Sequence, residues 1–402
     1  WPFNAAEIQF VLVTHAHFDH TGRLPKLYHD GFRGRIYSTQ ATAELAQYIL
    51  ADAADLQYRQ ARQHRSLPLY SLNEVKALSS LYTSVEYDDQ IHLDGDIDVL
   101  FRDAGHILGS AIIELTVGGK KLVFSGDLGN EPVPLMHQPE TVAEADVLFM
   151  ESTYGDRLHP KEDRILALRQ AILDVVANKG TLLIPAFAVE RTQELLYNLN
   201  EMHEKKSIPE IPIFVDSPLA IEVTGVFRRW EKMFDGETQT HINHGDDIFA
   251  FPHLKYSTTV EESKAINLVA SPKVVIAGSG MMNGGRILHH LIQYAPLPST
   301  IICVVGFQVP GTLGRRFLDG DRQVHILHQE VNIEAEVRNI PAFSAHADQT
   351  QLVEWVQHFK QLGKIVLIHG EDDSRHLLGE KIANLLPGVK IVYPTFEQVI
   401  EI

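Results

Sequence analysis

The residues best suited to metal chemistry lie in one short segment, Thr14-His15-Ala16-His17-Phe18-Asp19-His20. Imidazole and carboxylate side chains are zinc ligands, and four of them fall here directly after an apolar run. In a loop that leaves a strand, His15 and His17 can point one way while Asp19 and His20 turn towards a neighbouring point. That arrangement suits two metal ions better than one. The alternative is a histidine-rich loop that is exposed to solvent and binds no metal. A single His-x-His would favour this alternative, but the full His-x-His-x-Asp-His pattern favours a metal site.

Two closed metal sites need further ligands, which we expect at later strand ends. His106 is a candidate beside Gly105, because glycine permits a close backbone approach. Asp127 in Ser-Gly-Asp is another, since a carboxylate can bridge two cations, and paired metals hydrolyse phosphate esters. His369, in His-Gly-Glu, is the third. Taken singly, each also fits a turn aspartate or a capping or buried histidine.

Short apolar runs position these residues, and many of them end in a polar or glycine-containing group. Their length and β-branching favour buried strands. The expected strands are 10–14, 121–124, 147–150, 182–184, 213–215, 274–277, 301–305 and 365–368. Helical patterns lie between them at 40–65, 162–178, 189–204, 218–234, 284–294, 349–361 and 374–386. This alternation predicts an α/β protein with mostly parallel sheets and functional groups beyond the strand C-termini. By composition, the segment 235–265 is the least ordered.

The composition limits the ways in which the chain could bind its partners. The 402 residues are enough for two domains, and no apolar run is long enough to span a membrane. Cys303 is the only cysteine, which favours a cytoplasmic setting. The net charge of −17 has the wrong sign for a broad basic face that binds nucleic acid. Contact with RNA would therefore be local, through bound cations, a few arginines and backbone amides.

The motifs, taken in order, resemble those of the metallo-β-lactamase superfamily. The segment His15–His20 resembles its second motif, Gly105-His106 its third, and Ser125-Gly126-Asp127 its fourth. Three later segments are similar to motifs A, B and C of the β-CASP branch: Glu151-Ser152-Thr153-Tyr154-Gly155, Phe343-Ser344-Ala345-His346-Ala347-Asp348 and His369-Gly370-Glu371. The likeness is greatest to bacterial and archaeal RNA-processing members, relatives of the nuclease of the pre-mRNA 3′-end machinery.

The resemblance implies a four-layer αβ/βα metallo-β-lactamase domain with an inserted α/β β-CASP domain. The expected ranges are 1–160 and 341–402 for the first domain and 161–340 for the second, with the active site in the cleft where they meet. Family members begin with a hairpin that bears a first-motif aspartate. This sequence starts too late to contain that hairpin, so we expect the sequence to be truncated.

By carry-over from the family, one zinc ion would bind His15, His17 and His106, and a second would bind Asp19, His20 and His369. Asp127 would bridge the two ions, with a hydroxide between them. His346 would protonate the leaving oxygen, and Glu151 would orient His346 and raise its basicity. Taken alone, Glu151 also fits a helix start and His346 a cap. The histidine in motif C implies RNA rather than DNA as the substrate.

Several residues are candidates for contact with the RNA backbone. Two glycine-rich stretches supply exposed amides together with Ser279, Gly280 and Arg286 in the first and Gln308 in the second, although such loops are often only turns. Phe187 could stack on a base, and Arg191 lies in the same family-like stretch, but a core aromatic fits Phe187 equally well. We interpret three further histidines as surface residues whose spacing fits no compact metal site: His241, His244 and His253.

The sequence leaves two other functions open. A small-molecule hydrolase of the thioesterase or lactamase type could use the same zinc scaffold, although the long segment between Glu151 and His346 exceeds what a small substrate needs. A non-catalytic RNA-binding subunit is the third alternative, and its expected sign, decayed motifs, is absent. The sequence does not determine the oligomeric state, and a homo-oligomer is compatible with it.

Overall fold

The computed structural model describes residues 1–160 and 163–402, which form two compact units. Unit 1 comprises Trp1–Leu158, Lys232–Asp235 and Ala345–Ile402, and unit 2 comprises His159–Glu231 and Gly236–Ser344. The domain ranges expected from the sequence stay a prediction, because compactness alone does not define a domain. Within the described residues, no helix has both the length and the apolar character needed to cross a membrane.

Unit 1 contains two sheets. A parallel sheet has the order β1-β2-β3, with β1 at Phe10–Leu12, β2 at Arg35–Thr39 and β3 at Tyr82–Val85. The larger sheet has the order β18-β17-β8-β7-β6-β5-β4. Its strands are β4 (Ile91–Leu93), β5 (Ile97–Asp103), β6 (Ala111–Val117), β7 (Lys120–Phe124), β8 (Glu144–Met150), β17 (Gln361–Leu367) and β18 (Lys390–Val392).

The larger sheet is mixed, so the expectation of mostly parallel sheets is wrong for this part of the chain. Strands β7, β8, β17 and β18 are parallel, whereas β4 to β7 form an antiparallel meander. Gly118 and Gly119 turn β6 into β7 with φ values of 57° and 75°. Two positive φ values are typical of the tight turns that close hairpins.

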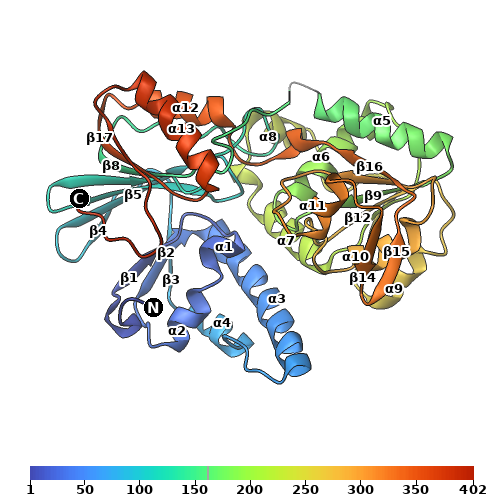
Figure 1. The fold of residues 1–402 in the computed structure, drawn as a ribbon, viewed down its shortest axis with the longest axis horizontal. Helices are drawn as coiled ribbons and strands as arrows, with labels where there is room; N and C mark the ends of the chain where they lie inside the picture. The colour runs from blue at the N-terminus through green and yellow to red at the C-terminus, as the bar shows by residue number, and fades with distance from the viewer. Residues whose placement is uncertain (161–162) are drawn as a thin grey trace. The chain divides into compact units, whose positions relative to one another are not determined.

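The helices of unit 1 cover the outer faces of its two sheets (Figure 1). They are η1 (Ala5–Glu7), α1 (Phe18–Thr21), α2 (Leu24–His29), α3 (Gln40–His64), α4 (Leu72–Leu78), α12 (Gln349–Gln357) and α13 (Asp372–Leu385). Helix α3 packs on β2 and β3. Along β6, Ile113 packs towards the small sheet and Ile112 towards α12 and α13, as the twofold alternation of a strand requires. The layers are therefore helix, sheet, sheet and helix, as expected.

Unit 2 is built on a parallel sheet with the order β11-β10-β12-β9-β13-β16. Its strands are β9 (Thr181–Pro185), β10 (Ile213–Val215), β11 (Leu254–Tyr256), β12 (Lys273–Ala277), β13 (Ile301–Val304) and β16 (Glu336–Asn339), beside a hairpin of β14 (Gln323–Ile326) and β15 (Gln329–Asn332). Its helices are α5 (Arg164–Ala177), α6 (Arg191–Glu204), α7 (Pro218–Arg229), α8 (Gly236–Asn243), α9 (Val260–Ile266), α10 (Ile287–Tyr294), α11 (Leu313–Leu318) and η3 (Pro341–Phe343), and η2 spans Glu231–Met233.

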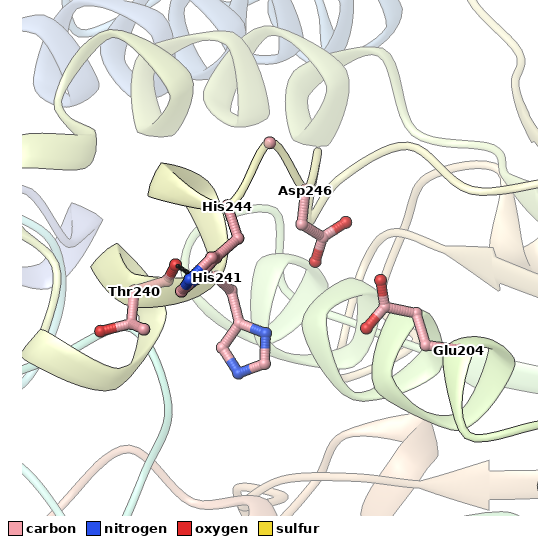
Figure 2. A pocket seen from close by; sticks show the side chains of 6 residues that line it. Glu204, Thr240, His241, His244 and Asp246 are labelled. Carbon is pink, nitrogen blue, oxygen red and sulfur yellow. Dashed lines mark hydrogen bonds between the residues drawn. The ribbon is translucent and has the colours of Figure 1, made fainter.

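The segment 235–265 is more regular than its composition suggested. It contains α8, β11 and α9, and Thr259 and Glu262 form a reciprocal cap at the start of α9. His241 and His244 lie at the end of α8 rather than in an open loop (Figure 2). The expectation that this was the least ordered stretch is therefore wrong.

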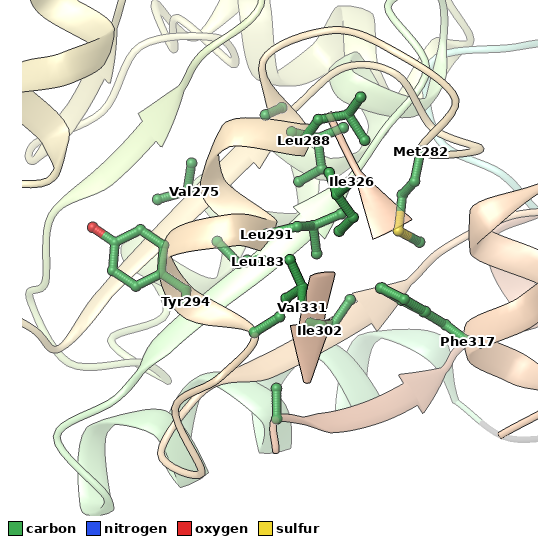
Figure 3. Packing of buried hydrophobic residues seen from close by; sticks show 14 of the residues in the cluster. Leu183, Val275, Met282, Leu288, Leu291, Tyr294, Ile302, Phe317, Ile326 and Val331 are labelled. Atoms are coloured by element: carbon green, nitrogen blue, oxygen red, sulfur yellow. The ribbon is translucent and has the colours of Figure 1, made fainter. Parts of the chain in front are cut away.

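The core of unit 2 lies on one face of the parallel sheet. Leu183, Val275 and Ile302 point from β9, β12 and β13 into this core, where Leu291 of α10 and Phe317 of α11 meet them (Figure 3). Helix α5 packs against the same three strands, whose alternate residues Leu182, Val274 and Ile276 are also buried. A sheet with both faces covered explains the continuous apolar runs in the sequence.

Candidate metal centre

Asp127 lies at the centre of a cluster of imidazoles in unit 1. Its Oδ2 atom is 3.4 Å from Nε2 of His15, 3.4 Å from Nε2 of His20 and 3.6 Å from Nε2 of His106. Its Oδ1 atom is 3.6 Å from Nε2 of His369. Residues separated by several hundred positions in the sequence therefore meet around one carboxylate.

The sheet topology explains why these residues meet. Asp127 follows β7, Glu151 follows β8 and His369 follows β17, and these three strands are parallel neighbours. Their C-terminal ends therefore lie at one edge of the sheet. The His15–His20 segment follows β1 of the small sheet, and His106 lies in the turn between β5 and β6.

Two glycines allow the ligand loops to approach one another. Gly105 has a φ of +62°, and a Cβ atom there would lie 2.4 Å from the carbonyl oxygen of His137. Gly126 has a φ of +56°, and its Cβ atom would lie 2.9 Å from Cβ of Thr14. Any larger residue would be strained in its backbone and would clash. Both glycines adjoin a ligand candidate, so they help to place His106 and Asp127.

The ligand atoms predicted from the sequence form two groups, and the atoms of each group lie within 4.8 Å of one another; Asp127, Glu151 and His346 form a further group of this kind. The first group comprises His15, His17, His106 and Asp127, and the second comprises Asp19, His20 and His369. In the second group, Nε2 of His369 and Nε2 of His20 lie 3.7 Å and 3.8 Å from Oδ2 of Asp19. These are the sets that the family resemblance implied. Their binding of metal stays a prediction.

The chemistry of this cluster fits zinc. Among the described residues, three of its buried atoms have no hydrogen-bond partner: Nε2 of His15, Nε2 of His20 and Oδ1 of Asp127. Buried polar atoms are normally paired, because an unpaired one carries a desolvation penalty. A bound cation would satisfy all three atoms. Imidazole and carboxylate are also the donors that zinc prefers.

Four of the predicted ligands have pKa shifts that favour the protonation states that bind metal, whereas for His20 Asp127 outweighs burial and raises the pKa. Burial lowers the pKa of His15 despite the opposing charge of Asp127, and it lowers the pKa of His106 well below the usual value. Burial, together with His15, lowers the pKa of His17 to about 3. For Asp127, burial raises the pKa, but His15 and the other histidines outweigh it and hold the pKa well below the usual range. Neutral imidazole and ionised carboxylate are the ligand forms.

Two neighbouring groups orient the imidazoles. Nδ1 of His106 lies 3.2 Å from the carbonyl oxygen of Ala345, to which it can donate, so that Nε2 carries the lone pair towards the cluster. Nδ1 of His15 lies 3.1 Å from Oγ1 of Thr14. The sequence did not indicate that Thr14 and Ala345 contact these imidazoles. Their only distinguishing feature in the sequence is that they adjoin His15 and His346.

A second pair of residues, Glu151 and His346, borders the ligand cluster. Oε2 of Glu151 lies 3.2 Å from Nδ1 of His346, and Nδ1 of His346 is 3.9 Å from Oδ2 of Asp127. The backbone amide of Leu128 donates to Oε1 of Glu151 at 2.6 Å. Burial lowers the pKa of His346, but Glu151 outweighs it and raises the pKa to about 9. The structure thus brings together the two residues that the sequence analysis paired.

Four of the residues predicted to contact RNA lie together in unit 2. Gln308 is buried, and its Nε2 donates to the carbonyl oxygens of Gly280 and Gly306 at 3.1 Å and 3.2 Å. A Cβ atom on Gly280 would lie 2.7 Å from Cδ2 of Phe187, whose side chain remains 37% exposed. Ser279 accepts from the amide of Asn283. Gln308 thus ties the two glycine-rich loops together, and Phe187 is the exposed member of the four, whose contact with a base stays a prediction.

The two predicted arginines use their guanidinium groups within the protein. Arg286 donates to Oδ1 of Asp216 at 2.7 Å and to the carbonyl oxygens of Ser257 and Thr258. Arg191 is buried and forms ion pairs with Glu190 and Glu194. These contacts favour structural roles, and RNA contact by either arginine stays a prediction.

Comparison with known families agrees with this geometry. The family model of the Beta-lactamase superfamily domain matches residues 2–184. The Beta-Casp domain matches residues 192–317, and the Zn-dependent metallo-hydrolase RNA specificity domain matches residues 330–394. Together the three models match most of the chain.

Individual proteins are similar over most of the chain. Ribonuclease TTHA0252 of Thermus thermophilus is 37% identical over 382 residues, which cover 95% of this chain and 85% of that protein. Transcription termination factor FttA of Thermococcus kodakarensis is 31% identical over 392 residues, which cover 92% of this chain but 60% of that protein. A crystal structure of a protein of unknown function from Enterococcus faecalis V583 has a TM-score of 0.55 at 13% identity and covers 97% of this chain and 80% of its own, so it supports the fold alone.

The chain therefore belongs to the β-CASP family of metallo-β-lactamase-fold nucleases, which are metal-dependent hydrolases.

Proposed function

We propose that this chain is a cytoplasmic ribonuclease that binds two zinc ions through the two ligand groups and hydrolyses phosphodiester bonds of RNA. The main support for this proposal is that the Nε2 atoms of four histidines lie 3.4 to 3.6 Å from the carboxylate oxygens of Asp127. RNA is the proposed substrate because of the RNA specificity domain and the relatives named as a ribonuclease and a transcription termination factor.

When bound, the zinc ions would supply a water of lowered pKa and positive charge beside the phosphate. The residues of the chain supply the rest. The two carboxylate oxygens of Asp127 lie beside imidazoles of both ligand groups, so Asp127 would fix the position of one group relative to the other. Glu151 orients His346 through Nδ1, and proton transfer takes place from Nε2 of His346 to the leaving oxygen.

The proposed reaction exchanges one phosphorus–oxygen bond for another. The oxygen of water bonds to phosphorus, and the bond from phosphorus to the leaving oxygen breaks. The water releases one proton to solvent as its oxygen bonds to phosphorus. The leaving oxygen takes its proton from His346, which solvent then reprotonates. The products are two RNA fragments, one of which ends in the new phosphate. No redox partner is needed.

A labelled-RNA digest tests this proposal. Single-stranded RNA labelled at either end should be cut by the zinc-loaded protein, and a chelator should abolish the cutting until zinc is restored. Accumulation of internal fragments indicates endonuclease action, whereas release of mononucleotides from the 5′ end indicates 5′-exonuclease action.

The same protein should be assayed against thioester and lactam substrates. Rapid hydrolysis of these substrates without RNA cleavage would favour the small-molecule hydrolase. RNA binding without any hydrolysis by a zinc-loaded sample would instead favour a non-catalytic RNA-binding subunit. The position of the RNA in a cleft between domains stays a prediction.

A further inference from the structure

We infer that Glu201, Glu204 and His241 bind one divalent transition-metal cation, Zn²⁺ by preference, which joins helix α6 to helix α8. One potential ligand atom from each residue lies within 4.8 Å of the others. All three residues belong to unit 2, whereas the ligands around Asp127 belong to unit 1. The inference does not depend on the substrate of the first site.

The helices present these three residues at favourable positions. Glu201 and Glu204 are three residues apart in the last turn of α6, so they lie on one face of it. His241 lies in the last turn of α8. Two carboxylates at the C-terminal end of a helix face the negative end of the helix dipole, which favours cations. A bound metal ion would offset both charges.

The distance between the ligand atoms of Glu201 and His241 suits two ligands of one cation and is too long for a direct hydrogen bond. Oε1 of Glu201 lies 3.8 Å from Nδ1 of His241, which is too far for a hydrogen bond. Two ligands of a tetrahedral zinc ion lie about 3.4 Å apart. Oε2 of Glu201 forms an ion pair with Lys205, so Oε1 is the oxygen that faces the imidazole.

A cavity of about 570 Å³ adjoins these side chains and is lined by Glu204, Thr240, His241, His244, Gly245 and Asp246. Figure 2 shows the imidazole of His241 and the carboxylates of Glu204 and Asp246 directed towards a common space. Burial raises the pKa of Asp246, and the nearby charges of Asp247 and Glu201 raise it further against Asn200 and His241. The cavity therefore has a negative potential that would attract a cation.

His244 lines the same cavity but does not belong to the group of potential ligands. Its Nδ1 atom lies 2.7 Å from the carbonyl oxygen of Thr240, to which it can donate. His241 is therefore the imidazole of the inferred site. Sites made only of carboxylates suit Mg²⁺ and Ca²⁺, whereas imidazole favours zinc and its neighbours.

The test is the zinc content of the full chain after equilibration with micromolar free Zn²⁺. A Glu204→Gln/His241→Ala double variant should hold about one zinc ion fewer per chain than the wild type. Its RNA cleavage should be unchanged, and zinc should raise its thermal stability less. Circular dichroism checks that the double variant folds, and the single variants Glu204→Gln and His241→Ala replace it if it does not.

The matched control is His253→Ala, because His253 is an exposed histidine of the same unit, 3.5 Å from Glu210. This variant should keep the full zinc content. Repeating both measurements on an Asp127→Ala background separates the inferred site from the first one. Equal zinc contents in the double variant and the wild type would overturn the inference, as would an equal loss from the His253 control.

Discussion

Nδ1 of His346 lies 3.2 Å from Oε2 of Glu151, although the two residues are 195 positions apart in the chain. Glu151 is buried and also accepts from the backbone amides of Leu128 and Thr153, so its position is well defined. Asp348 caps helix α12 two residues after His346 and accepts from the amides of Thr350 and Gln351. Glu151 therefore fixes the imidazole at Nδ1, and the cap at Asp348 fixes the backbone just after His346.

Replacing His346 with alanine should slow RNA cleavage by about 10²–10⁴-fold while zinc stays bound, because the proton donor is lost but no ligand is. Single-turnover rates and zinc content measure the two effects. His358→Ala is the control, since His358 is an exposed histidine at the end of α12. Loss of zinc from the His346 variant would make this residue a ligand instead.

Glu151→Gln should preserve the shape of the contact but remove its charge. Because Glu151 raises the pKa of His346, the variant should lose the acid form of His346 at a lower pH than the wild type. The alkaline limb of the kcat profile should therefore move to lower pH, and kcat should fall by about 10-fold or more. An unchanged pH profile with reduced kcat would point to a purely structural role.

Asp127→Ala should remove zinc and activity together. Asp127 contacts both ligand groups, and its loss leaves buried imidazoles without the shared carboxylate. We expect the variant to hold about two zinc ions per chain fewer than the wild type, and cleavage to fall by more than about 10⁴-fold. Asp55→Ala changes an exposed aspartate of α3 and should alter neither value. Full zinc content in the Asp127 variant would contradict the bridging role.

Lys273 should make the stability of unit 2 depend on pH. Its Nζ atom is buried and donates to the carbonyl oxygens of Ile266 and Val269, and burial lowers its pKa to about 8. The unfolded chain retains this proton up to about pH 10.4. Between these values the unfolded state binds more protons, so the free energy of unfolding should rise with pH.

A Lys273→Met variant should lose this rise between about pH 8 and pH 10. Thermal unfolding across this range measures the effect, and Lys255→Met provides the control, because Lys255 is an exposed residue of β11 in the same sheet. An identical pH dependence in the Lys273 variant and the wild type would show that Lys273 keeps an ordinary pKa in the folded state.

The sequence predicted the strands that carry site residues because each is a short apolar run followed directly by a polar group. β8 before Glu151 and β17 before His369 are examples. It did not predict the antiparallel half of the larger sheet. The alternation of Val99 and Phe101 in β5 and the Gly118-Gly119 turn are signals for that meander, but they are weaker than the continuous apolar runs of the parallel strands.

The orientation of each imidazole could not be predicted. It depends on partners that are distant in sequence or belong to the backbone, such as the carbonyl oxygen of Ala345 beside His106. Likewise, Glu201 and His241 belong to different helices, and no local pattern places Oε1 of Glu201 beside an imidazole. Only the three-residue spacing of Glu201 and Glu204 was visible in the sequence.

The position of β17 beside β8 has a consequence for biosynthesis. Until residues 361–367 leave the ribosome, β8 lacks its neighbour on one side, and the cluster lacks His369, which follows β17. A growing polypeptide therefore cannot complete its hydrolytic centre until translation of this region is nearly finished.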